Sequence, residues 1–166
     1  MAEKDKVIEN KLKRDGIFDF KETYKFIYRW LNEENYDISE DKYQETVAGD
    51  AKDIEIKWTA TKKISDYFKF EIVLSWRILR LVNVEAEKDG RKLKMNKGSF
   101  ELKVKGTVIK DYEGRWENRP AMKFLRGVYD RYVIRGRIEQ YEDKLIKDVN
   151  DLIEETKSFL TIEGMK

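Results

Sequence analysis

The sequence has 166 residues, of which 40% are hydrophobic and 41% are charged. Its 35 basic and 33 acidic side chains leave a net charge of only +2, so overall charge points to neither a polyanionic nor a polycationic partner. Histidine and cysteine are absent, which excludes Ser-His-Asp and Cys-His catalysis, thiol redox chemistry, zinc fingers, iron-sulfur clusters and disulfide bonds.

The first part of the chain predicts two strands and a helix. Residues 7–14 alternate weakly and suit a short edge strand. Asp19 followed by Glu22 resembles a capping box, and apolar side chains then recur at helical spacing over residues 20–32. The period later changes to two, so residues 54–61 are expected to form a strand.

The clearest strand pattern covers residues 68–78, where large apolar side chains alternate with mostly polar ones. This alternation is typical of an antiparallel strand with one face in water. Continued to Glu87, the strand would be about 65 Å long at 3.3 Å per residue. We therefore expect a bend or turn near residues 80–83, and two strands rather than one.

A hairpin and a last strand are predicted next. Asp89-Gly90 is a preferred dipeptide for a two-residue hairpin loop, because both residues tolerate a positive φ. This loop would join the preceding strand to residues 91–95. After a break at residues 96–98, the alternation over residues 100–108 predicts a separate last strand.

A long C-terminal helix is predicted after Pro120, since proline fits the first turn of a helix. Apolar stripes at helical spacing continue to residue 160. An unbroken helix would be about 60 Å long, whereas a compact chain of this size is roughly 40 Å across. We expect either a break near residues 135–136, where Gly136 weakens the helix, or a projecting end whose apolar stripe needs a partner.

These elements predict a single α+β domain over residues 1–166. It would contain an antiparallel sheet of about five to seven strands, with an N-terminal helix and a long C-terminal helix packed on one face. The order of elements resembles the helix-grip arrangement of START-type proteins. That resemblance implies a curved sheet around the last helix, often with a cavity of lipid or hormone size. With no signal peptide and no run of 18 apolar residues, we expect a cytoplasmic protein without a membrane span.

The apolar sheet face suggests the first function, binding of an apolar or amphipathic small molecule by a non-catalytic module. The rings of Trp58, Phe70, Trp76 and Phe100 could wall a cavity between the sheet and the C-terminal helix, or fill an ordinary core. If the alternation ran on unbroken, Arg80 would be buried and would need an anionic partner such as a ligand carboxylate or headgroup. If the strand turns there, its side chain reaches water.

The basic segment 115–137, with six of the eleven arginines, suggests a second function. Arginine forms bidentate contacts with phosphate, and a neighbouring tryptophan offers a ring for base stacking. The candidate residues for binding nucleic acid or an anionic surface are Arg115, Trp116, Arg119, Lys123 and Arg126. The same cations also suit a solvated helix face with internal ion pairs. A third alternative is an assembly protein that docks on another chain through its C-terminal helix.

No sequence motif indicates catalysis, a cofactor or a metal. The chain has no GxGxxG, no Walker A loop and no GxSxG elbow. Helical carboxylate pairs such as Glu139 and Asp143 lack EF-hand spacing and suit a solvated surface. The sequence therefore favours a protein that is not an enzyme and that has no cofactor or metal site.

Overall fold

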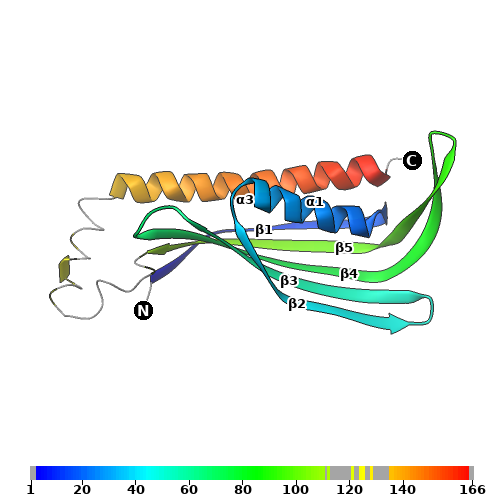
Figure 1. Ribbon diagram of the computed structural model, residues 1–166, viewed down its shortest axis with the longest axis horizontal. Helices are drawn as coiled ribbons and strands as arrows, with labels where there is room; N and C mark the ends of the chain where they lie inside the picture. Colours follow the sequence, from blue (N-terminus) through cyan, green and yellow to red (C-terminus); the bar gives the residue numbers. More distant parts are fainter. Residues whose placement is uncertain are drawn as a thin grey trace.

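The computed structural model describes residues 3–110, 112, 121, 124–125, 128 and 135–164. The regular elements in these residues are long, and two of the strands have 20 residues or more. In chain order they are β1 (Glu3–Phe18), α1 (Phe20–Glu33), β2 (Asp37–Ala48), β3 (Ala51–Lys63), β4 (Phe68–Lys88), β5 (Arg91–Lys110) and α3 (Arg135–Gly164) (Figure 1).

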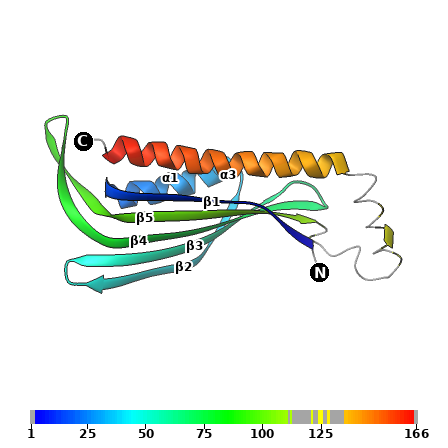
Figure 2. The ribbon, with the colours of Figure 1, turned by 180° about the vertical axis from the view of Figure 1, so that it is seen from behind.

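The five strands form one antiparallel sheet in the order β1-β5-β4-β3-β2. The first strand thus pairs with the last, and β2 lies at the opposite edge. Helices α1 and α3 both lie over the same face of the sheet, which we call the inner face (Figures 1 and 2). This arrangement confirms the predicted α+β class, the antiparallel sheet and the N-terminal and C-terminal helices. The likeness to helix-grip proteins stays a prediction.

The inner face is apolar, as the alternation along residues 68–78 predicts. Most of the large side chains that point inward from the middle of the three central strands are at most 3% exposed, among them Ile54, Ile56, Trp58, Phe68, Phe70, Ile72, Leu74, Trp76, Ile78, Phe100, Leu102 and Val104. Each large apolar side chain that is buried in this way contributes about 1.5–3 kcal/mol. The alternating residues between them form the outer face.

β4 remains a single strand through the region where we expected two. The expectation of two strands is wrong because a bulge bends β4 without ending its pairing to β5. At this bulge the register with β5 shifts between Leu79 and Val82, and Arg80 has a φ of 54°. Across from it, a Cβ on Gly98 would lie 2.9 Å from the carbonyl oxygen of Leu79, so the close approach requires glycine. Beyond the bulge the β4–β5 arm curves up past the end of α3 (Figure 1).

The Asp89-Gly90 hairpin is confirmed. These two residues have φ angles of 52° and 76°, and Lys88 pairs with Arg91 on either side of them. The predicted break at residues 96–98 is wrong, because this segment pairs with both β4 and β1. The strand β5 is therefore continuous from one end of the sheet to the other.

Helix α1 begins where the sequence predicts. The Asp19 side chain accepts a hydrogen bond of 3.1 Å from the backbone N–H of Glu22 and caps the helix. Its buried stripe consists of Thr23, Ile27 and Leu31, which face the sheet and α3. A neighbouring flank carries the half-buried Tyr24, the exposed Tyr28 and several cations, which are described below.

Helix α3 has 30 residues, which corresponds to a length of about 45 Å. It packs closely on the sheet through Leu145 and Val149, both fully buried. A Cβ on Gly106 of β5 would lie 3.1 Å from a methyl carbon of Val149 and 3.2 Å from Cγ of Leu145. Glycine at this position therefore allows the helix to approach the sheet. From Arg135 to residue 160 the predicted C-terminal helix is confirmed, and Gly136 belongs to α3. Most of the predicted stretch over residues 120–134 lies outside the described part.

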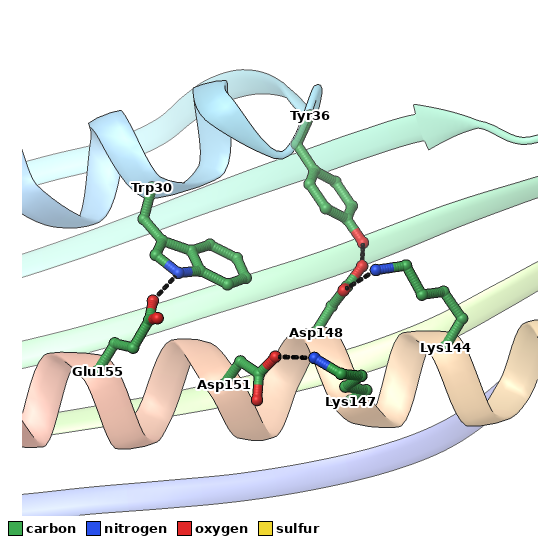
Figure 3. Close-up of polar contacts among 7 residues, drawn as sticks. All are labelled: Trp30, Tyr36, Lys144, Lys147, Asp148, Asp151 and Glu155. Carbon is green, nitrogen blue, oxygen red and sulfur yellow. Dashed lines mark hydrogen bonds and ion pairs between the residues drawn. The ribbon is translucent and has the colours of Figure 1, made fainter.

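Polar contacts tie α3 to α1 and to the connection that follows α1 (Figure 3). The indole N–H of Trp30 donates a hydrogen bond to the Glu155 carboxylate. Tyr36, just before β2, donates to the buried carboxylate of Asp148. The Asp148 carboxylate also accepts from Lys144, one helical turn away. These contacts fix how α3 lies beside α1 above the sheet.

Candidate functional site

The candidate site lies where α1 meets the edge strand β2. From Ser39 to Ala48 every residue of β2 is exposed, whereas the facing residues of β3 alternate between buried and accessible. Two tyrosines of α1, Tyr24 and Tyr28, stand above this edge. Opposite them, Tyr43 of β2 is 43% exposed although it belongs to the inner face through its pairing with Ile56.

The tyrosines continue the aromatic core to the surface. The ring of Tyr24 lies 4.9 Å from that of Trp58 and 5.7 Å from that of Trp76, measured between centroids. Tyr28 lies 5.9 Å from Trp58, and Tyr43 lies 6.4 Å from Tyr24. Aromatic pairs at such separations stabilise each other by edge-to-face and stacked contacts. The surface rings are therefore held against a rigid base.

Carboxylates of β2 orient these rings. Oε2 of Glu40 accepts hydrogen bonds from the Tyr24 hydroxyl at 2.5 Å and from the Trp58 indole at 2.8 Å. The Tyr43 hydroxyl donates to Glu45 at 2.8 Å. Burial, with the hydrogen bond to Glu40 second, raises the pKa of Tyr24 above its usual range. Burial and the Glu45 carboxylate likewise raise the pKa of Tyr43 to about 12. Both hydroxyls are thus protonated donors at neutral pH.

Two adjoining hollows run along this flank of α1, and together we call them the α1 groove. The first, of about 480 Å³, is lined by Tyr24, Lys25, Tyr28, Arg29 and Asn32. The second, of about 340 Å³, is lined by Phe20, Lys21, Tyr24, Lys25 and Tyr43. Both volumes fall in the usual range for small-molecule sites, which are mostly apolar with a few orienting polar groups. The groove offers aromatic surfaces beside three cations.

The four aromatic residues predicted to line a cavity lie in the core. Trp58, Phe70, Trp76 and Phe100 are each at most 1% exposed on the inner face. Among the described residues, the indole of Trp58 has a hydrogen-bond partner, whereas Nε1 of Trp76 is buried without one. Trp58 and Trp76 thus form the floor beneath Tyr24, and Phe70 lies elsewhere, 6.3 Å from Tyr141 of α3.

Arg80 lies at the bulge of β4, four residues after Trp76. Its side chain is exposed, and its backbone N–H donates a hydrogen bond of 2.9 Å to Oδ1 of Asp53. It borders a separate surface hollow of about 450 Å³ beside Asp15 and Lys97. The structure therefore does not bring Arg80 together with Trp58 or Trp76.

The candidate polyanion-binding residues all fall outside the described part of the chain. They are Arg115, Trp116, Arg119, Lys123 and Arg126. The apolar stripe of α3, which could dock on another protein, is buried or half-buried beneath the helix; its residues are Ile138, Tyr141, Leu145, Val149, Leu152 and Phe159. That stripe contacts the sheet and α1 of the same chain.

Sequence reasoning missed the groove. Tyr24 and Tyr28 were recognised only as apolar positions of a helix, although Lys25 and Arg29 repeat at the same spacing of four. This repeat of two tyrosines and two cations along one side of the helix is the sequence pattern that could have indicated the groove. No comparable signal marked Tyr43, because its position opposite Tyr24 depends on the pairing of β2 with β3.

Comparison with known proteins adds no functional information. No protein-family model matches the sequence, and no curated protein matches it. In the described residues, no three carboxylates gather so that they could hold a metal ion. A separate search of the same residues finds no helix long and apolar enough to cross a membrane.

Proposed function

We propose that this protein is a non-catalytic binding protein that holds an amphipathic small molecule in the α1 groove. The observation that carries the proposal is that both hollows of the groove share the ring of Tyr24, which Glu40 and Trp58 hold in place. An apolar or aromatic body would lie against the tyrosine rings. An acidic group on the ligand would contact Lys25 and Arg29.

This location differs from the cavity expected between the sheet and the C-terminal helix. At Gly106, α3 approaches the sheet so closely that an added methyl group would already crowd Leu145 and Val149. Along α1, in contrast, aromatic surface remains open, with Tyr28 at 49% exposure. Exposed aromatic surface with a polar rim is typical of binding sites.

The charges of the groove favour an acidic ligand. Lys21, Lys25 and Arg29 line its two hollows, and among the described residues that line them there is no carboxylate. Of the three, Lys25 lies 3.7 Å from Glu22, an exposed pair that contributes little to stability. A ligand carboxylate or sulfonate can therefore replace Glu22 as the partner of Lys25 at small cost.

Titration with 8-anilinonaphthalene-1-sulfonate tests the proposal, because this probe joins a flat aromatic body to an acidic group. We expect saturable fluorescence enhancement with the folded protein. Tyr28→Ala and the double variant Lys25→Gln/Arg29→Gln should each weaken binding about tenfold. Lys157→Gln, at an exposed site on α3, is a control that removes a cation away from the groove and should bind as the wild type does.

Urea unfolding must accompany each titration, since the probe also binds loosely packed states. Variants with wild-type unfolding midpoints and weaker probe binding support the α1 groove. If these variants bind the probe as tightly as Lys157→Gln does, or if the wild type does not bind it, the proposal is wrong.

A further inference from the structure

Four lysines and one serine form a single row across the outer face of the sheet. Strand pairing places Lys42 opposite Lys57, and Lys57 opposite Ser75. It also places Ser75 opposite Lys103, and Lys103 opposite Lys11. Residues that pair directly point to the same face, so these five side chains line up at right angles to the strands. We call them the lysine row.

The lysine row is unfavourable by itself. Like charges directly opposite each other destabilise a sheet, and the row contains two such pairs, Lys42 with Lys57 and Lys103 with Lys11. The adjacent row on the same face is balanced, because Arg77 is paired in register with Glu55 on one side and Glu101 on the other. The lysine row therefore carries an excess of positive charge that the row next to it does not.

A hollow of about 330 Å³ lies over this row. The short side chain of Ser75 is at its centre, between the long side chains of Lys57 and Lys103. Five cationic side chains line the hollow, the four lysines of the row and Arg77, against the two glutamates Glu55 and Glu101, which leaves a net charge of +3. The hollow thus combines space with excess positive charge.

Its cations are available for a ligand. Lys42 lies 2.6 Å from Glu55, Lys11 lies 3.6 Å from Glu101, and Lys103 lies 2.8 Å from Glu9. The ion pairs of Lys42 and Lys11 are exposed and contribute little to stability, so they are easily exchanged. Lys103 keeps its positive charge beside the half-buried Glu9. In the described part of the chain, neither Lys57 nor Arg77 has a carboxylate within 4.0 Å.

We propose that the lysine row binds a small anion that carries two or more phosphate groups. Ammonium groups bind phosphate oxygens by charge-assisted hydrogen bonds, and the hydroxyl of Ser75 can donate one more from the floor. At about 4.8 Å between strands, the row is about 19 Å long and its inner lysines are about 10 Å apart. Consecutive phosphates can bridge this distance, whereas a single phosphate engages fewer of the lysines.

A single-stranded nucleic acid fits this face less well. Proteins that bind single strands present aromatic rings on which bases stack. Trp76 is among the residues that line the hollow, but its side chain points to the inner face and is 1% exposed. The other lining side chains on the outer face are lysine, arginine, glutamate and serine.

Calorimetric titration with inorganic tripolyphosphate at about 50 mM salt, where charges are weakly screened, tests the inference. We expect the wild type to bind tripolyphosphate at least about tenfold more tightly than orthophosphate. The double variant Lys57→Gln/Lys103→Gln should weaken tripolyphosphate binding about tenfold or more. Ser75→Leu should also weaken it, because leucine fills the hollow without changing its charge.

Lys92→Gln/Lys94→Gln is the matched control, since it removes the same charge from an exposed stretch of β5 beyond the bulge. It should change the affinity less than about twofold. Equal losses in the row variant and the control would show attraction by overall charge and would overturn the inference, as would absence of binding. Tighter binding of a single-stranded oligonucleotide than of tripolyphosphate would also overturn it, in favour of a nucleic-acid surface.

Discussion

The hydroxyl of Tyr36 donates a hydrogen bond of 2.9 Å to Oδ2 of Asp148, a residue 112 positions further along the chain. Both residues are only 2% exposed. The other carboxylate oxygen accepts from Lys144 at 2.8 Å (Figure 3). A buried carboxylate is costly unless its oxygens are paired, and here both are. The contact therefore allows α3 to carry an aspartate on its covered side and fixes the helix above the sheet.

Removal of this hydroxyl should destabilise the protein. We expect Tyr36→Phe to lower the free energy of unfolding by about 1–3 kcal/mol, because Asp148 loses a partner in a site that water does not reach. Urea unfolding followed by circular dichroism measures the change. Tyr28→Phe is the control, since that tyrosine is 49% exposed and its hydroxyl can be solvated. Equal midpoints for the two variants would contradict the role assigned to the contact.

The same tyrosine predicts a loss of stability at alkaline pH. Burial, followed by the charge of Asp148, raises the pKa of Tyr36 far above its unperturbed value of about 10. Above about pH 10 the unfolded chain loses this proton while the folded protein keeps it, so stability is fully present below that pH and falls above it. Urea midpoints between about pH 9 and about pH 11.5 should therefore fall more steeply for the wild type than for Tyr36→Phe. Parallel curves would show that Tyr36 does not cause the loss.

Local patterns in the sequence were enough to predict much of the fold. The cap at Asp19, the Asp89-Gly90 turn and the alternation over residues 68–78 each depend on neighbours in the chain, and all three appear as predicted. The edge strand β2 was not predicted. Its residues from Ser39 to Ala48 are all exposed, so burial imposes no alternation that a reader of the sequence could detect.

Features that depend on distant residues could not be predicted. β4 continues past Arg80 because Gly98, on another strand, leaves room for the bulge. The α1 groove likewise depends on the register that places Tyr43 on the inner face, next to Tyr24. The lysine row requires four strand registers at once. Each of these features depends on which residues of neighbouring strands pair with each other. The periodicity of a single segment gives no information about that pairing.

Close packing of α3 on the sheet predicts opposite effects for two glycines. Gly106→Ala places a methyl group 3.0 Å from Cγ2 of Ile8 and 3.1 Å from Cγ2 of Val149, so we expect a loss of about 1–3 kcal/mol from overpacking. Gly136→Ala meets no atom of the described residues within 4 Å and lies in the first turn of α3, so it should leave stability unchanged or raise it by up to about 1 kcal/mol. Thermal unfolding of both variants tests this. A stable Gly106→Ala protein would show that α3 can move away from β5 at little cost.

The ion pair between Glu9 of β1 and Lys103 of β5 predicts that the Glu9 carboxyl titrates at an unusually low pH. The hydrogen bond from Lys103, with a second from Lys6, lowers the pKa of Glu9 to about 2 from a usual value of 4.5. A carboxyl with a lowered pKa stabilises the folded state above the unfolded pKa, and this contribution is lost as pH falls from 4.5 towards 2. Carbon-13 NMR of the Glu9 carboxyl should give a midpoint near the lowered value in the wild type, and Lys103→Met should move it upward. Lys13→Met, two residues from Lys11 on the same strand face, removes equal charge without touching Glu9 and should leave the midpoint in place. If both variants moved it equally, the general charge of the outer face rather than the Lys103 contact would set the pKa of Glu9.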